Sequence, residues 1–225
     1  MLDRRRLLLG FVPAAAFSAA SNVASAAAEK QSVEFSPSYF SEEEWRFVNA
    51  AVARLIPSDG DGPGAIETGV PEFIDRQMEA PYGHGAYYYM QGPFVTDAPS
   101  TLGFQLKYTP REMYRAGIAA VNKALLNDGG SVFADLKVDK QDAFLEQLEK
   151  GLVSLAEIPA AAFFSQLLEN TREGYLSDPQ YGGNRGMAAW KWIGFPGARA
   201  DFTDWIDRPG QLYPLGPAAI RGSRL

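Results

Sequence analysis

The sequence predicts an all-α protein: a single domain of about five amphipathic helices wrapped by long loops rich in aromatic residues, glycine and proline. Three observations lead to this fold class. Apolar residues recur at helical spacing in several segments, two segments begin with a capping box, and the alternation typical of strands is almost absent. The chain of 225 residues is long enough to bury a core within one domain.

The first predicted helix begins after Ser41, because Ser41-Glu42-Glu43-Glu44 has the pattern of a capping box with Ser41 as the N-cap. Phe40 and Trp45 have the spacing of a hydrophobic staple around this start. Pro57 ends the helix because proline cannot continue its hydrogen bonds. Its apolar stripe consists of Trp45, Val48, Val52, Leu55 and Ile56.

Four further helices follow from the same kinds of signal. The second opens after Gly69 and has a proline in its first turn, and the third follows a capping box that begins at Thr109. The fourth runs from an Asp139 cap to Gly151, and the fifth starts after Pro159.

Two segments outside these helices are rich in aromatic side chains. Residues 81–108 are predicted to form a long, ordered, irregular excursion with one short strand or helical turn, and residues 178–213 are loop-rich. Long loops are usually functional, and Tyr, Trp, Phe and Met are preferred anchors of protein interfaces. We expect both segments to contact a partner, although packing onto the core explains any single aromatic residue equally well. The candidate contact residues are Tyr82, His84, Tyr87, Tyr88, Tyr89, Phe94, Tyr181, Trp190, Trp192 and Phe195.

Residues 1–28 have the three parts of an export signal: a charged head, an apolar run from Leu7 to Ala20, and small-residue cleavage sites. The run is shorter than the roughly 20 residues that span a bilayer, so a removable signal is favoured over an uncleaved anchor. Arg4 and Arg5 begin a segment that resembles the core of a twin-arginine signal, and an ordinary Sec signal is the alternative. We therefore expect export by the twin-arginine translocase to the periplasm. Residues 29–225 then form the mature domain, which starts with a polar, flexible or extended arm at 29–38.

Charge and composition exclude several classes of function. The signal holds three of the 21 basic and one of the 27 acidic residues, which leaves 18 and 26 and a net charge near −8. This balance disfavours nucleic-acid binding. The chain has no cysteine, which excludes c-type haem attachment and thiolate-held iron–sulfur clusters, and its one histidine makes a zinc site improbable.

No segment has a convincing catalytic pattern. Residues 60–65 satisfy a dinucleotide-binding pattern, but they follow a helix rather than a strand and contain a proline, so a tight loop is expected. Asp59 and Asp61 do not continue into an EF-hand, because its fifth and twelfth positions fall on Pro63 and Val70; a calcium site of another type stays open. His84 is the only histidine available as a general base, and no thiol, serine elbow or metal cluster accompanies it.

Several short pieces of sequence form an ordered set between about residues 40 and 200. They are Leu55-Ile56-Pro57-Ser58-Asp59, Gly62-Pro63-Gly64-Ala65 with Glu67 and Gly69-Val70, Phe73-Ile74-Asp75, Phe163-Phe164, Asp178-Pro179-Gln180-Tyr181-Gly182-Gly183-Asn184 and Trp192-Ile193-Gly194-Phe195-Pro196-Gly197. The set resembles the small subunit of membrane-bound gluconate 2-dehydrogenase, the subunit 3 family.

The resemblance implies a three-part complex in the bacterial inner membrane that faces the periplasm. A large flavoprotein subunit holds FAD and oxidises the sugar acid, and a multi-haem cytochrome c subunit passes electrons to ubiquinone. The small subunit carries no cofactor and no catalytic residue; it stabilises the flavoprotein and supplies its export signal. Related small subunits serve fructose, sorbitol and glucose dehydrogenases, and residues 81–108 look most like the gluconate branch. The alternative is a stand-alone periplasmic enzyme or binding protein that uses His84.

Overall fold

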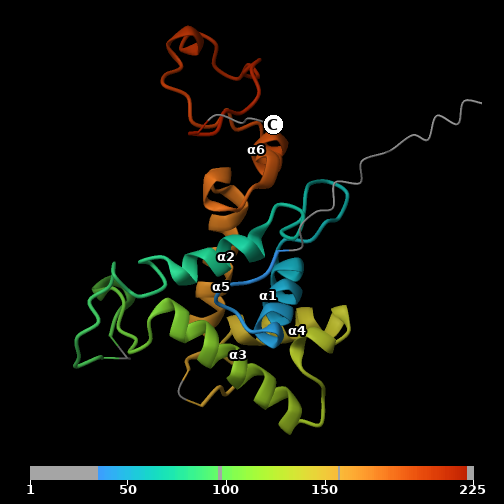
Figure 1. Cartoon of the computed structure of the whole chain (residues 1–225), viewed down its shortest axis with the longest axis vertical. Coiled ribbons are helices and arrows are strands. Elements are labelled where there is room, and N and C mark those ends of the chain that lie inside the picture. Colours follow the sequence, from blue (N-terminus) through green and yellow to red (C-terminus); the bar gives the residue numbers. More distant parts are fainter. Residues whose placement is uncertain (1–34, 96–97, 157, 222–225) are drawn as a thin grey trace, which may run out of the picture. The chain divides into compact units, whose positions relative to one another are not determined.

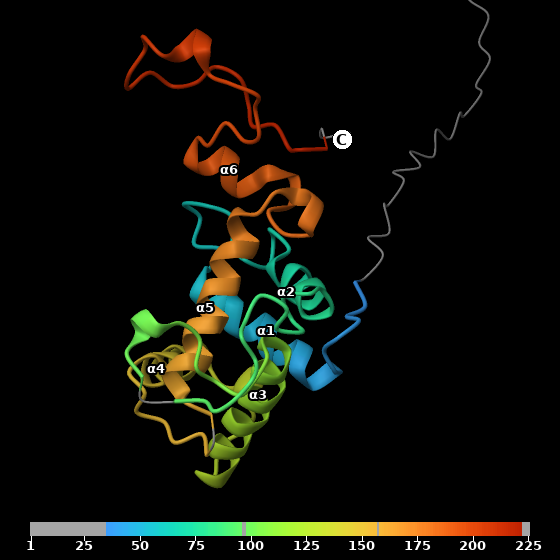
Figure 2. The same cartoon turned by 90° about the vertical axis from the view of Figure 1, so that its left-hand side faces the viewer.

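Helix α5 (Ala160–Leu176) is the element around which the others pack in the computed structural model, which describes residues 35–95, 98–156 and 158–221. All of the other α-helices in these ranges contact α5, as Figures 1 and 2 show. They are α1 (Glu42–Leu55), α2 (Val70–Glu79), α3 (Pro110–Asn127), α4 (Val138–Glu149) and α6 (Ala188–Ile193).

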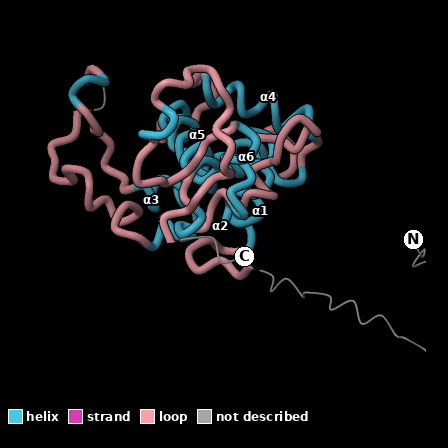
Figure 3. Tube along the Cα trace, turned by 90° about the horizontal axis from the view of Figure 1, so that it is seen from above, coloured by secondary structure: helices cyan, strands magenta, loops and turns pink. Residues whose placement is uncertain are grey.

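The predicted all-α class is confirmed. The described ranges contain helices, turns and two isolated bridges but no strand (Figure 3). Five short 3-10 turns complete the regular structure there: η1 (Ser100–Leu102), η2 (Phe133–Asp135), η3 (Pro179–Tyr181), η4 (Arg185–Met187) and η5 (Thr203–Trp205). The predicted export signal and residues 29–34 of the arm lie outside the described residues.

The predicted helix starts are largely confirmed. Both capping boxes are formed: the Ser41 hydroxyl accepts the N–H of Glu44, and Thr109 does the same at the start of α3. Helix α2 begins after Gly69, and α5 begins after Pro159.

Two details of the helices differ from the prediction. The N-cap of α4 is Lys137 rather than Asp139, which lies within the first turn, where a carboxylate favours the helix dipole without capping the end. Helix α6 was not predicted, because its six residues are too few to show a periodic pattern.

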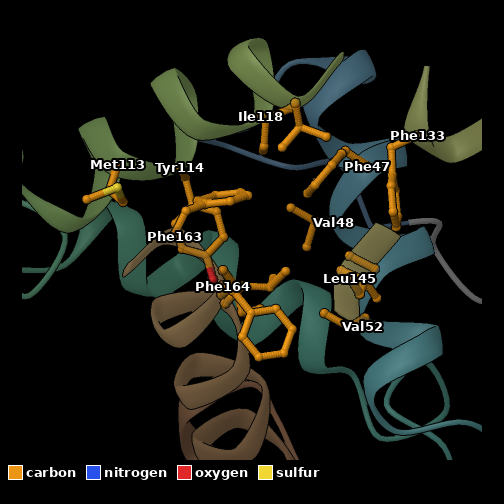
Figure 4. Packing of buried hydrophobic residues seen from close by; sticks show 14 of the residues in the cluster. Phe47, Val48, Val52, Met113, Tyr114, Ile118, Phe133, Leu145, Phe163 and Phe164 are labelled. Atoms are coloured by element: carbon orange, nitrogen blue, oxygen red, sulfur yellow. The ribbon is translucent and has the colours of Figure 1, made fainter. Parts of the chain in front are cut away.

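Phenylalanine and tyrosine rings from four elements fill the core (Figure 4). Phe163 of α5 is fully buried, and its ring centre lies 6.1 Å from that of Phe47 on α1 and 6.2 Å from that of Tyr114 on α3. Gly117 makes this packing possible, because a Cβ at that position would overlap the Phe163 ring. A glycine inside a helix costs about 1 kcal/mol relative to alanine, and here the close approach of α3 and α5 requires it.

The residues just before α1 are held against α2 by a buried carboxylate. Asp75 of α2 is fully buried, and Oδ2 accepts hydrogen bonds from the backbone N–H and the hydroxyl of Ser38, both at 2.8 Å. Oδ1 accepts the N–H groups of Tyr39 at 3.0 Å and Phe40 at 3.1 Å. The ring of Phe35 lies 5.5 Å from that of Trp45. Residues 35–40, called the N-terminal strap below, are therefore bound to the helices, in contrast to the flexible form of the arm that the sequence allowed.

The strap also changes the expected staple at the start of α1. The ring of Phe40 faces Tyr114 at 5.5 Å, whereas the ring of Trp45 pairs with Phe35. The two staple residues thus have different ring neighbours, because the strap folds back over the first turn.

Asp75→Asn is expected to lower the free energy of unfolding by about 2–4 kcal/mol, because an amide nitrogen cannot accept the hydrogen bonds of the strap. Urea unfolding followed by circular dichroism measures this loss. The control is Asp142→Asn, which breaks an exposed pair with Arg54 and should cost less than about 1 kcal/mol. A loss for Asp75→Asn no larger than that of the control would contradict the role of the buried carboxylate.

Candidate partner-binding surface

The residues around α2 and the end of α5 meet in a junction of two segments far apart in the sequence. The backbone N–H of Arg185 donates to the carbonyl of Thr68 at 2.9 Å, and the guanidinium of Arg185 pairs with Glu72 at 2.8 Å. The hydroxyl of Tyr175 donates to the carbonyl of Pro63 at 2.8 Å. These contacts bind the loop before α2 and the first turn of α2 to the end of α5 and the turn that follows it.

Two polar side chains fix the course of the chain after α5. Asn184 has a left-handed backbone with φ of 43°; its amide donates to the carbonyl of Ser177, and its oxygen accepts the N–H of Ala189 in α6, both at 3.0 Å. The carboxylate of Asp178 accepts the backbone N–H two residues later at 3.0 Å and that of Ile220 at 2.7 Å. The start of α6 and the end of the described chain are therefore anchored to the same turn.

Helix α6 presents its two tryptophans in opposite directions. Trp190 is 6% exposed, and its indole N–H donates to the carbonyl of Leu176 at 2.8 Å. Trp192 is 55% exposed, with one face against Gly62, where a Cβ would come within 2.7 Å of the ring. Phe195 packs edge-on to Trp190 at 5.1 Å and stays 44% exposed. Among these predicted contact residues, Trp192 and Phe195 are accessible, and the buried ring of Trp190 packs against Phe195.

An open groove of about 490 Å³ brings the two predicted contact segments together. Tyr82 and Tyr87 come from residues 81–108, and Tyr181 comes from η3. Glu173 and Leu176 of α5 also line the groove, and the sequence analysis did not identify them. The complete lining of this tyrosine groove is Phe73, Gln77, Tyr82, Tyr87, Glu173, Leu176, Ser177, Asp178 and Tyr181.

A buried amide supports one wall of the tyrosine groove. Asn170 is fully buried on α5, and its amide nitrogen donates to the hydroxyl of Tyr82 at 2.9 Å and to Oε2 of Glu173 at 3.0 Å. Its oxygen accepts the hydroxyl of Tyr114 at 3.2 Å. Desolvation raises the pKa of Tyr82, and desolvation together with the neighbouring Glu169 carboxylate raises the pKa of Glu173. Asn170 and Glu173 are three positions apart and so share one face of α5, which is the sequence signal for this network.

In the described residues 81–95 and 98–108 the predicted irregular excursion projects away from the helices, as Figures 1 and 3 show. The ring of Tyr88 stacks on Phe104 at 4.5 Å and lies 6.3 Å from Tyr82. Its neighbours Tyr87 and Tyr89 are 73% and 75% exposed. Tyr88 therefore holds the segment together and turns the two adjacent tyrosines towards solvent. Phe94, further along the segment, is half-buried.

His84 lies outside the lining of the tyrosine groove and beside a cation. Its ring is exposed, and Nη1 of Arg111 lies 2.6 Å from Nε2 and 3.3 Å from Nδ1. Arg111 also approaches Glu79 at 3.5 Å. The structure thus places His84 in a polar surface cluster.

The carboxylates of the loop between α1 and α2 accept hydrogen bonds from groups of the same loop. Asp59 accepts the N–H of Asp61 at 3.1 Å, and Glu67 accepts the N–H of Gly64 and the hydroxyl of Ser58, both at 2.9 Å. The hydrogen bonds from Gly64 and Ser58 lower the pKa of Glu67. In the part of the chain that the structure describes, no group of three or more His, Cys, Asp or Glu residues is placed to hold a metal ion.

Residues 198–218, called the C-terminal loop, have their two ends side by side next to α6. The N–H of Ala198 donates to the carbonyl of Ala218 at 2.7 Å, which closes the neck of the loop. The loop lies beyond α6 in Figures 1 and 2. Phe202 and Trp205 each pack against the ring of Tyr213 at 5.4 Å inside it. Its exposed aliphatic residues include Ile206, Leu212 and Leu215.

Most of the exposed large apolar side chains lie in two stretches, residues 87–102 and 176–220. Single exposed apolar residues are normal, but their concentration makes these two stretches candidates for an interaction surface. No helix in the described ranges has the length and apolarity to cross a bilayer.

The comparisons with known proteins gave one match. The family model for gluconate 2-dehydrogenase subunit 3 matches residues 42–197. The match extends from α1 through α6 to the neck of the C-terminal loop and includes every residue that lines the tyrosine groove. No curated protein and no solved structure matched the chain.

Glu173→Gln is expected to remove one contribution to the pH dependence of the free energy of unfolding. Because the folded protein raises the pKa of Glu173 above its ordinary value of 4.5, folding favours the protonated form. This contribution is complete below 4.5 and is lost as the pH rises through the raised pKa. Gln is neutral at every pH and keeps an oxygen that accepts from Asn170.

Parallel thermal unfolding of wild type and Glu173→Gln, from acidic to neutral pH, measures this effect. The wild type should lose stability relative to the variant as the pH rises. A difference in Tm that stays constant over that range would show that the carboxyl group is not shielded from water.

Proposed function

Because the chain belongs to the gluconate 2-dehydrogenase subunit 3 family, we propose that it is the non-catalytic small subunit of a periplasm-facing, membrane-bound gluconate 2-dehydrogenase complex. In this proposal a large flavoprotein subunit holds FAD and oxidises D-gluconate to 2-dehydro-D-gluconate. A multi-haem cytochrome c subunit carries the electrons to ubiquinone. This chain binds and stabilises the flavoprotein and supplies its export signal.

The observation that carries the binding role is the meeting of tyrosines from two long segments in one groove. Tyr87 and Tyr181 are 73% and 51% exposed, yet both line the tyrosine groove. Tyrosine buries a large area with few rotatable bonds, which makes it a frequent anchor at interfaces. The wall of the groove is held by Asn170, so the site is supported before a partner arrives.

The non-catalytic role is supported by how the polar residues of the junction are used. Asp75, Asp178 and Asn184 all bind backbone groups, which fixes loops and helix ends. The exposed ring of His84 lies beside the guanidinium of Arg111, outside the lining of the tyrosine groove.

The export role is supported by the sequence of residues 1–28. A twin-arginine signal serves proteins that fold before export, and this chain contains no cofactor ligands of the cysteine type. We propose that the cofactor which requires early folding belongs to the flavoprotein. The small subunit then carries the folded flavoprotein across the membrane.

Replacing both Arg4 and Arg5 by Lys is expected to leave the flavoprotein in the cytoplasm when the two full chains are co-expressed. The measurement is bound flavin in the periplasmic and cytoplasmic fractions. Arg6→Lys is the matched control, because it makes the same substitution at the neighbouring arginine and keeps Arg4 and Arg5. Arrival of the flavoprotein in the periplasm with both arginines replaced would rule out the escort role.

The double variant Tyr87→Ala/Tyr181→Ala is expected to retain at least tenfold less flavoprotein than wild type, because each interface anchor of this type contributes about 2 kcal/mol and about 1.4 kcal/mol already corresponds to a factor of ten. The measurement is flavin absorbance per tagged small subunit after co-purification. Leu152→Ala is the control, since Leu152 is 71% exposed and lies outside the groove. Equal flavin in both variants would remove the tyrosine groove from the interface.

A further inference from the structure

The tyrosine groove combines aromatic walls with carboxylates. Its apolar side chains include Phe73 and Leu176, and its charged lining residues are Glu173 and Asp178, with no Lys or Arg among them. Both charges in the groove therefore have the same sign.

The two carboxylates differ in how they are used. Asp178 is buried, and both of its oxygens accept backbone N–H groups, so it belongs to the fold. Glu173 receives one hydrogen bond, from Asn170 to Oε2. Within the described ranges Oε1 of Glu173 accepts no hydrogen bond, and no Lys or Arg pairs with this residue.

The side chain of Glu173 is exposed, and in the described ranges no Lys or Arg is paired with it. Partial desolvation raises the pKa of Glu173, and Glu169, one turn earlier on α5, adds a like charge. A cation that docks beside these two neighbouring carboxylates relieves their repulsion. The tyrosine rings at the walls suit the aliphatic stem and the charged end of Lys or Arg.

We propose that the tyrosine groove binds a segment of the partner subunit in which a Lys or Arg neighbours apolar side chains, with the cation pairing with Oε1 of Glu173. The inference rests on the proposed function and adds the chemistry of the segment that binds. The apolar side chains of the segment contact Tyr87, Leu176 and Tyr181, and the cation sets its register along the groove.

Charge reversal at Glu173 tests the proposal in the full small subunit co-expressed with the flavoprotein. Glu173→Lys is expected to lower the flavin retained per tagged small subunit about tenfold or more, because it places like charges together. Glu169→Lys is the matched control on the same helix, outside the groove lining, and should stay within about twofold of wild type. The reversed residue follows Glu169 by four positions, a spacing that favours the helix, but it removes the acceptor of the Asn170 amide. Glu173→Gln keeps that acceptor and removes only the charge, so it should also lower the retained flavin.

Each outcome decides between the alternatives. Flavin retention by Glu173→Lys equal to that of Glu169→Lys overturns the inference, and so does an equal loss in both variants. If only the Tyr87/Tyr181 double variant loses the flavoprotein, the groove binds apolar side chains without a cation, and the proposed function stands.

If the wild-type small subunit brings down no flavoprotein, the proposed function itself fails. If Glu173→Lys retains flavin and instead abolishes self-association, measured by size-exclusion chromatography, the occupant is a second copy of this chain.

Discussion

The buried carboxylate of Asp75 is the interaction on which the rest of the described structure depends. It accepts four hydrogen bonds from Ser38, Tyr39 and Phe40, and a carboxylate deprived of both water and partners is costly. Helix α2 and the N-terminal strap are therefore stable only together. Because α2 also packs against α1, α3 and α5 and supplies Phe73 to the tyrosine groove, one buried charge connects the start of the domain with the proposed binding surface.

The features that the sequence predicts well are those whose signal is local. The capping boxes at Ser41 and Thr109 are complete within four residues, so the starts of α1 and α3 follow from the sequence alone. The contact between Asp75 and Ser38 joins residues 37 positions apart, and no local pattern indicates it. Gly117 likewise looks like a weak point in a helix until the ring of Phe163 is placed against it.

For the proposed binding surface, too, the sequence indicates the candidate residues but not how the fold arranges them. Aromatic composition indicates that residues near Tyr82, Tyr181 and Trp192 are candidates for contact, but it does not say which of them meet. Tyr82 and Tyr181 share a groove because α5 lies between their segments, whereas Trp190 and Trp192 separate because two positions on a helix point to opposite sides. Glu173 was missed because an exposed charged residue on a helix gives no signal of its own, and it becomes part of a groove only because Tyr82 and Tyr87 line the same space.

The hydrogen bond at the neck of the C-terminal loop makes the sequence of the loop independent of the packing of the helices. Since Ala198 and Ala218 are hydrogen-bonded to each other, the residues between them can change in number and type without altering the path of the chain through the helices. A residue change in the helical part must preserve the packing of the helices, whereas a residue change in the loop need only preserve the ring contacts inside the loop. Residues 199–217 can therefore diverge in sequence while the helices that carry the tyrosine groove keep their packing.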